Sequence, residues 1–491
     1  MNDKLLYQCL NGSKYRVKNF LHSSRSAVTI IEVLFAIGIV VVGLYGVMIL
    51  VPLAGRQALE SYAITQTAAA SQNAFREFQA RGLHYPNRNR PWLLCEDIAL
   101  PAMPGVAAYD QLPAYYSSFA TPAFVPVRSY KELIQYQAGK LVASGLDVAT
   151  AQLNAATSGF CIDPLFWSAQ PLVGTDPILS GTEFGYRRSR FPYYQETLNP
   201  LENPASPANA WGMQPRLLRV TYPSAPINAS APVYPASSVG FVPAKGKLAQ
   251  KLFASQDDVS NPISDADGSV NGIRGYYTTS TGEILQQATK QNVSWMATLS
   301  PLEQATGTLP NAFTLSIVAF HNRDRAFEAP VMNSSTGFDP EDLPDAERIA
   351  WAVPPDLTMG SSPTEVTYSG TNGFDLELYG NDHVSSKIKP GEWLMLSRAF
   401  GTLQIHKWYR VVSASAEADE SGTPNFTSIT DPYGNAYPSA SVPKVWRKSV
   451  HVIGPDWIFS TVSGVGASPT IATIMPNVLN VFERVVDIPW E

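Results

Sequence analysis

The stretch VTIIEVLFAIGIVVVGLYGVMILVPLAG, from Val28 to Gly55, decides the architecture of this chain. Its uncharged part, Val33 to Pro52, holds 20 residues. At about 1.5 Å per residue these form roughly 30 Å of helix, which is enough to cross the hydrocarbon core of a bilayer. We therefore predict one transmembrane helix over residues 28–54, near the start of the 491-residue chain.

The segment before this helix, residues 1–27, is polar and net basic, and Asp3 is its single acid. Its basic residues are Lys4, Lys14, Arg16, Lys18 and Arg25. Because positive charges favour the cytoplasmic side, the N-terminus stays in the cytoplasm and everything after Arg56 faces outward. The sequence thus predicts a single-pass protein with an extracytoplasmic C-terminal domain.

One charged residue, Glu32, interrupts the apolar run. A carboxylate inside the membrane costs at least a few kcal/mol, so such a residue asks for a partner and marks a candidate functional site. Glu32 is the fifth residue counted from Val28.

The segment Ser26-Ala27-Val28-Thr29-Ile30-Ile31-Glu32 resembles the cleavage site of type IV prepilins. In that family a small residue precedes the cut, an apolar residue follows it, and glutamate is fifth in the mature chain. Ala27 stands where the family usually has glycine, and Val28 where it most often has phenylalanine. The resemblance implies that a prepilin peptidase removes residues 1–27 as a leader and N-methylates Val28.

The same resemblance gives Glu32 a role, which is to pair with the N-terminal amine of a neighbouring subunit in a filament. The segments Glu32-Val33-Leu34 and Gly43-Leu44-Tyr45-Gly46, together with Ala36, look more like minor pilins and minor pseudopilins than like a major pilin. The implied partners are prepilin peptidase, other pilins or pseudopilins, and the lipid of a bacterial inner membrane. The implied assembly is a type IV pilus or a type II secretion pseudopilus.

Other N-terminal signals fit the residues less well. A secretory signal has a shorter apolar core, and Leu53-Ala54-Gly55 is a weak exit site for it. A lipoprotein signal needs cysteine where the chain has Arg56. A plain signal anchor remains open, but it leaves Glu32 without a role.

The helix is expected to continue beyond the membrane over residues 55–82. This stretch contains no proline. Its apolar residues fall near one face at helical spacing, namely Leu59, Ala63, Ala70, Ala74 and Phe78. Gly82 is a natural stop. We expect one long N-terminal helix whose second half is amphipathic and supports the exported domain.

Residues 83–491 are expected to form a large β-rich domain, so that the fold class is α+β. The 39 prolines of the chain favour turns and strand edges over helix interiors. One further helix is predicted over residues 130–156, and loops over 203–210 and 222–240. Short runs rich in β-branched and aromatic residues predict strands in an antiparallel sheet or sandwich. These runs are 217–222, 294–299, 313–321, 393–397, 407–413, 450–453 and 478–487.

Removal of the leader takes Cys9 away and leaves Cys95 and Cys161. An even pair fits one disulfide in an oxidising compartment, and two free buried thiols fit the residues equally well.

Few residues carry a pattern that points to chemistry. Asp265 and Asp267 lie in a Gly-containing turn with alternating oxygen donors, which is a weak calcium candidate, although the other acidic ligands of a calcium loop are missing. The histidines lack zinc-site spacing, and the sequence has no phosphate-binding glycine loop or nucleophile elbow. A net charge of −6 gives no basic surface for nucleic acid. We therefore expect neither catalysis nor a cofactor.

Two functions remain open at this level. The first is a structural subunit of a filament, with the large domain at its tip or surface. The second is a membrane-anchored adhesin or binding module that uses the prepilin route only for export. An anchored enzyme has only the size of the domain in its favour.

Overall fold

We analysed a computed structural model of the chain. It describes residues 29–88, 90–96, 123–143, 147–169, 190–192, 216–223, 244, 249, 252–254, 261–262, 273–278, 284–289, 293–302, 310, 312–321, 323, 332–333, 337–338, 347–356, 365–380, 387–400, 403–421, 429–430, 436–437, 445–460 and 470–489. By its internal contacts the chain divides into two compact units, residues 1–61 and 62–491.

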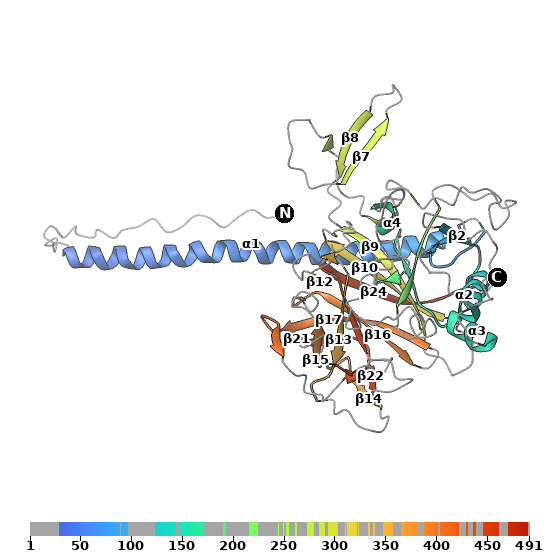
Figure 1. Ribbon diagram of the computed structural model, residues 1–491. Helices are drawn as coiled ribbons and strands as arrows, with labels where there is room; N and C mark the ends of the chain where they lie inside the picture. Colours follow the sequence, from blue (N-terminus) through green and yellow to red (C-terminus); the bar gives the residue numbers. More distant parts are fainter. Residues whose placement is uncertain are drawn as a thin grey trace, which may run out of the picture. The chain divides into compact units, whose positions relative to one another are not determined.

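Helix α1 (Ile30–Arg81) is a single helix that continues through Pro52. It ends where the sequence predicts, because Gly82 follows it with a φ of 58°, a left-handed conformation that glycine adopts without a steric penalty. Gly82 N and Leu83 N donate to Gln79 O and Phe78 O and so satisfy carbonyls of the last turn. The first unit thus contributes only the start of this helix to the described structure (Figure 1).

The second half of α1 buries one face against the domain. The predicted apolar positions Ala63, Ala74 and Phe78 are buried, as are the polar residues Thr67 and Ser71. Both hydroxyls donate to carbonyls of their own helix. Thr67 Oγ1 lies 2.8 Å from Ala63 O, and Ser71 Oγ lies 2.9 Å from Ala68 O. Because the hydroxyls are satisfied within the helix, two polar positions can join the buried face.

Shorter helices in the described part of the chain include α2 (Tyr130–Ala143), α3 (Val148–Ala156) and α4 (Pro164–Ala169). The single helix predicted over 130–156 is therefore wrong, since two helices occupy that range. The break lies between Ala143 and Val148, and Asp147 stands at the position that caps the N-terminus of α3. Helical periodicity in the apolar residues persisted across this break, which is why the sequence concealed it.

The first sheet has eight strands, seven of them in the order β2-β1-β5-β3-β9-β10-β24, with β4 also pairing with β5. Its strands are β1 (Trp92–Glu96), β2 (Ala123–Val127), β3 (Phe160–Ile162), β4 (Arg190–Phe191), β5 (Leu217–Thr221), β9 (Val293–Pro301), β10 (Ala312–His321) and β24 (Val478–Asp487). The neighbouring strands of this sheet pair antiparallel, except that β3 and β5 are parallel. The runs predicted at 217–222, 294–299, 313–321 and 478–487 all lie in this sheet.

A second sheet closes on itself into a six-stranded barrel. Going round it, β15 (Phe374–Gly380), β13 (Arg348–Val353), β23 (Ile471–Ile474), β16 (Trp393–Phe400), β17 (Leu403–Ala414) and β21 (Val445–Ile453) pair in turn, and β21 pairs again with β15. Every pairing is antiparallel. Strand β18 (Asp419–Ser421) adds to β21 outside the ring. Closure removes the free edges that an open sheet would expose.

The remaining strands form small sheets. In one of them β8 (Ile284–Thr289) lies between β6 (Asn261–Pro262) and β7 (Ile273–Thr278). The others are pairs: β14 (Glu365–Tyr368) with β22 (Trp457–Ser460), β11 (Met332–Asn333) with β12 (Gly337–Phe338), and β19 (Ile429–Thr430) with β20 (Ala436–Tyr437). The β14–β22 pair covers the barrel core, in which Trp457 and Phe459 are buried. Arg398 fixes this cover by donating to Ile458 O at 2.7 Å.

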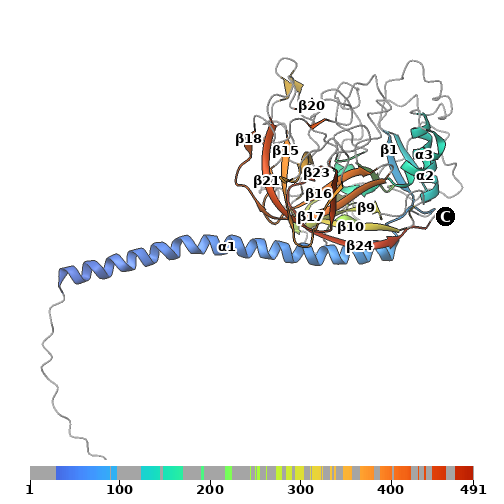
Figure 2. The same cartoon turned by 90° about the horizontal axis from the view of Figure 1, so that it is seen from below.

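The first sheet is a middle layer with different partners on its two faces. Along β9, Trp295, Ala297 and Leu299 join Phe78 of α1 in one core. The intervening Met296 joins Trp408 of the barrel in another core. Since neighbouring side chains on a strand point to opposite faces, α1 covers one face and the barrel covers the other (Figure 2).

The barrel is an insertion within this sheet. Strands β10 and β24 are antiparallel neighbours, yet the six barrel strands lie between them in sequence, from Arg348 to Ile474. The chain leaves the sheet after His321 and returns to it at Val478. We call the contact between the inserted barrel and the sheet the junction. The predicted antiparallel sheet is thus present, and the closed barrel is a feature that the sequence analysis did not predict.

Candidate functional site

The N-terminal site predicted from the sequence lies partly within the described residues. Ala27 and Val28, between which cleavage is predicted, lie outside them. Glu32 lies in the first turn of α1, where its backbone N–H donates to Thr29 O at 3.0 Å. An acidic residue in the first turn also interacts favourably with the positive end of the helix dipole.

Within the described part of the chain, Ile30–Pro52 is the one helical segment long and apolar enough to cross a membrane. All its side chains are exposed, including that of Glu32. No described residue makes a hydrogen bond or an ion pair with the Glu32 carboxylate. Exposure of so many apolar side chains to water is unfavourable, so this segment is expected to contact an apolar environment or another protein surface.

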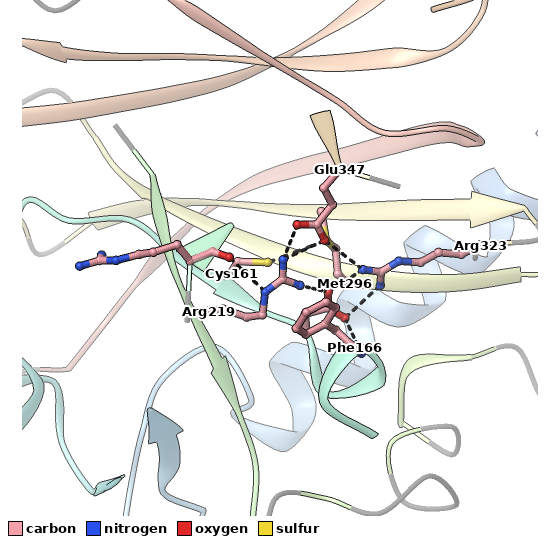
Figure 3. A network of polar contacts seen from close by, with 8 residues as sticks. Cys161, Phe166, Arg219, Met296, Arg323 and Glu347 are labelled. Atoms are coloured by element: carbon pink, nitrogen blue, oxygen red, sulfur yellow. Dashed lines mark hydrogen bonds and ion pairs between the residues drawn. The ribbon is translucent and has the colours of Figure 1, made fainter. Parts of the chain in front are cut away.

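A second candidate lies at the junction, where four charged side chains are buried together (Figure 3). Asp163 and Arg219 belong to the sheet side. Arg323 follows β10, and Glu347 directly precedes β13, so both lie on the path that leads into the barrel. We call these four residues the charge cluster. Their side chains are at most 5% exposed.

Each guanidinium in the charge cluster makes two-point contacts. Arg219 donates to Asp163 Oδ2 at 2.6 Å and to both oxygens of Glu347 at 2.8 and 2.6 Å. Arg323 donates to Asp163 Oδ1 at 2.9 Å and to Oδ2 at 2.6 Å. All four carboxylate oxygens therefore accept at least one charge-assisted hydrogen bond, the strong type in proteins.

The electrostatics of the charge cluster follow from burial and pairing. Burial alone would raise the pKa of Asp163, but the guanidiniums of Arg323 and Arg219 hold it below its usual value. Burial likewise opposes the charge on Arg219, while Glu347 and Asp163 raise its pKa. Two cations and two anions balance, so the charge cluster is stable only as a complete set.

Local structure explains how the residues reach these positions. Asp163 caps the short helix α4, accepting a hydrogen bond from Phe166 N at 3.3 Å, and Pro164 occupies the first helical position. Arg219 lies in β5 beside β3, with its guanidinium carbon 3.9 Å from the centre of the Phe166 ring. These contacts hold the side chains of Asp163 and Arg219 in place, independently of Arg323 and Glu347.

The charge cluster can hold two parts of the chain together, but it is not arranged for a reaction. Its acceptors are saturated, and the neighbouring Cys161 is fully buried, which raises the pKa of its thiol well above the usual value. A protonated, buried thiol is a poor nucleophile. We therefore regard the charge cluster as a clamp that fixes the start of the barrel to the sheet.

Cys161 is a free thiol in this structure and contacts Met296 Sδ at 3.8 Å. The disulfide considered between Cys95 and Cys161 is thus absent. Strands β1 and β3 pair with opposite edges of β5, which separates the two cysteines by about two strand spacings, or roughly 10 Å. Disulfides need Cα atoms within about 7 Å, so the sheet itself keeps them apart.

The weak calcium candidate, Asp265 and Asp267, lies outside the described residues. Within those residues, no three His, Cys, Asp or Glu side chains are grouped as a metal would require.

Sequence reasoning missed the charge cluster, although two signals were available. Asp163 stands alone in the apolar run FCIDPLFW, and Arg219 interrupts the strand LLRVT. A lone charge in an apolar run implies a buried partner. The partners lie 56 and 128 residues from Arg219, so the sequence could show that they were needed but not which they were.

Comparison with known proteins gives no further assignment, since no family model, no curated protein and no solved structure matches this chain.

Proposed function

We propose that this protein is a minor pilin-like or pseudopilin-like structural subunit of a filament, either a type IV pilus or a type II secretion pseudopilus. The observation that carries the proposal is Glu32, the one carboxylate in the exposed apolar segment Ile30–Pro52 of α1. The proposal includes removal of residues 1–27 by a prepilin peptidase and N-methylation of Val28. It requires no catalysis and no cofactor.

The division of α1 supports this proposal. Its first part is exposed and apolar, and its second part is one-sided and packs on a β-sheet. In a filament, the first parts of neighbouring subunits would bury one another, and the domain would remain at the surface. Glu32 would then pair with the amine of Val28 in the adjacent subunit, which offsets its burial and sets the axial register.

Substitution of Glu32 by valine tests the pairing. Glu32→Val removes the charge and keeps an apolar side chain, so we expect leader removal to persist and the amount of protein in purified filaments to fall at least tenfold. A tenfold change corresponds to about 1.4 kcal/mol, which is modest for a buried ion pair.

Glu77→Val is the matched control, because Glu77 lies on the same helix in an exposed pair with Arg81. This control should enter filaments normally. Unchanged incorporation of Glu32→Val would refute the pairing role.

The inserted barrel favours a second candidate function, a membrane-anchored adhesin or binding module exported by the prepilin route. An insertion between two adjacent strands adds a complete folded body to the sheet without being needed for its pairing. Purified filaments distinguish the two candidates, since wild-type protein that is processed but absent from filaments would favour the binding module.

A further inference from the structure

The junction contains a histidine whose surroundings suit only its neutral form. His406 and Trp408 project from β17 toward the sheet, where Trp408 Nε1 donates to Thr298 Oγ1 at 3.0 Å. The His406 side chain is buried, and its Nδ1 lies 2.9 Å from Ser397 Oγ on the neighbouring strand β16. Its Nε2 is buried without a hydrogen-bond partner among the residues that the structure describes.

The sheet packs closely against this ring. Gly159 precedes β3, and a Cβ atom there would lie 3.2 Å from His406 Cδ2 and 3.0 Å from Leu299 O. The absence of a side chain at Gly159 thus allows the barrel to approach the sheet at this point. A proton on Nε2 would have no acceptor among the described residues, so charging the buried ring costs free energy.

Burial lowers the pKa of His406 from 6.5 to about 3. When the junction is open, the ring is solvated and takes up a proton below about pH 6.5, whereas in the closed junction it stays neutral. Lowering the pH therefore favours the open state.

We propose that the junction is an acid-sensitive contact, in which protonation of His406 releases the inserted barrel from the sheet while each part keeps its own core. Two of the three cores lie within a single part of the molecule, one between α1 and the sheet and another inside the barrel, and these would persist on opening. The third core, which includes Met296 and Trp408, spans the junction and would be exposed.

Other titratable groups at the junction act in different pH ranges. The charge cluster also favours opening in acid, but the guanidiniums of Arg323 and Arg219 lower the pKa of Asp163, so its carboxyl takes up protons only in more acidic solution than His406 does. Glu483 of β24 opposes opening, because burial raises its pKa and the closed state binds its proton more tightly. Lys407 follows His406 in β17 and donates to Asp456 O at 3.2 Å. Between pH 7 and 5, His406 is the main group that drives opening.

The size of the effect follows from the two pKa values of His406. The pKa of His406 is 6.5 in the open state and about 3 in the closed state. The equilibrium constant for opening should therefore rise about 25-fold from pH 7 to pH 5. Protonation of Glu483 in the closed state would reduce this rise toward pH 5.

Cys161 supplies a reporter, because it is fully buried in the junction core beside Met296. The experiment uses the full chain in detergent with Cys9→Ser and Cys95→Ser, so that Cys161 is the only thiol. Its rate of reaction with 2,2′-dithiodipyridine, which reacts with thiols in acid, is measured from pH 7 to pH 5. Each rate is divided by the rate of the denatured protein at the same pH.

We expect the normalised rate to rise by about 25-fold or somewhat less across this range. In His406→Asn, which can still hydrogen-bond Ser397 but does not titrate, the rate should not rise toward pH 5. His451→Asn is the matched control, since His451 pairs with Asp375 on the exposed barrel surface, and it should keep the wild-type rise.

A flat wild-type rate, or an undiminished rise in His406→Asn, would overturn the proposal. Should His406→Asn not fold, His406→Gln carries the same test, and the wild-type titration alone still decides whether the junction opens. Circular dichroism at pH 5 must retain its β-sheet signal, because a loss of that signal would mean general unfolding and would also overturn the proposal.

Discussion

Glu32 and the charge cluster both place charge in apolar surroundings, but only the charge cluster pairs its charges within the described structure. Glu32 stands in an exposed apolar helix, and no described residue pairs with it. Asp163, Arg219, Arg323 and Glu347 are buried together and saturate one another. The charge cluster is complete within one molecule, and the Glu32 site is not.

This difference indicates what each site is for. A complete, neutral set of buried charges needs nothing from outside and can hold two parts of one chain in a fixed arrangement. A lone carboxylate on an apolar helix has its partner elsewhere. Variants at the two sites should therefore differ in kind, with loss of stability at the charge cluster and loss of assembly at Glu32.

The largest effect is expected from Arg219→Met. This change removes both strong hydrogen bonds to Glu347 and leaves Arg323, at 3.9 Å, as a more distant cation beside that buried carboxylate. Breaking a buried ion pair by removing one partner costs about 3–5 kcal/mol. Urea denaturation of the full chain in detergent should show that loss in the free energy of unfolding.

Arg76→Met is the control for charge removal as such, since Arg76 is exposed on α1. It should change the free energy of unfolding by less than about 0.5 kcal/mol. If the two variants were equally stable, the charge cluster would not be a clamp.

A smaller effect is expected from Gly159→Ala. The added methyl group would meet Leu217 Cδ2, Leu299 O and the His406 ring. Overpacking of this kind costs about 1–3 kcal/mol, so the free energy of unfolding should fall by that amount. Gly55→Ala on α1 has open space around it and should cause no loss. Equal results for the two alanines would show that the junction is not tightly packed.

The smallest effect on stability is expected from Glu32→Val, the variant that should most impair assembly. Because the Glu32 side chain is exposed, the free energy of unfolding of the domain should stay within about 0.5 kcal/mol of wild type. The measurement is urea denaturation followed by tryptophan fluorescence. A large loss of domain stability would mean that reduced assembly reflects misfolding rather than a missing pair.

The elements with strong local patterns could be predicted from the sequence. Helix α1 was expected from its apolar run and the stop at Gly82, and β24 has the predicted bounds Val478–Asp487. These segments carry their own signal, because composition and periodicity act over neighbouring residues.

The barrel and the charge cluster depend on distant residues and could not be predicted in this way. Closure of the barrel joins Phe374 to Val452 across a long stretch of chain. Strand β13, RIAWAV, has the alternating Ile, Trp and Val of a strand, but nothing in it indicates that it pairs with β15 and β23. In the charge cluster, Arg323 meets Asp163 from 160 residues away. Local patterns carry no information about such pairings.

The measurement that tests the central proposal most directly is the mass of the mature N-terminus. Protein purified from the membrane fraction is digested, and its N-terminal peptide is identified by mass spectrometry. The proposal predicts a chain that starts at N-methylated Val28. An intact Met1, or a start after residue 54, would contradict it.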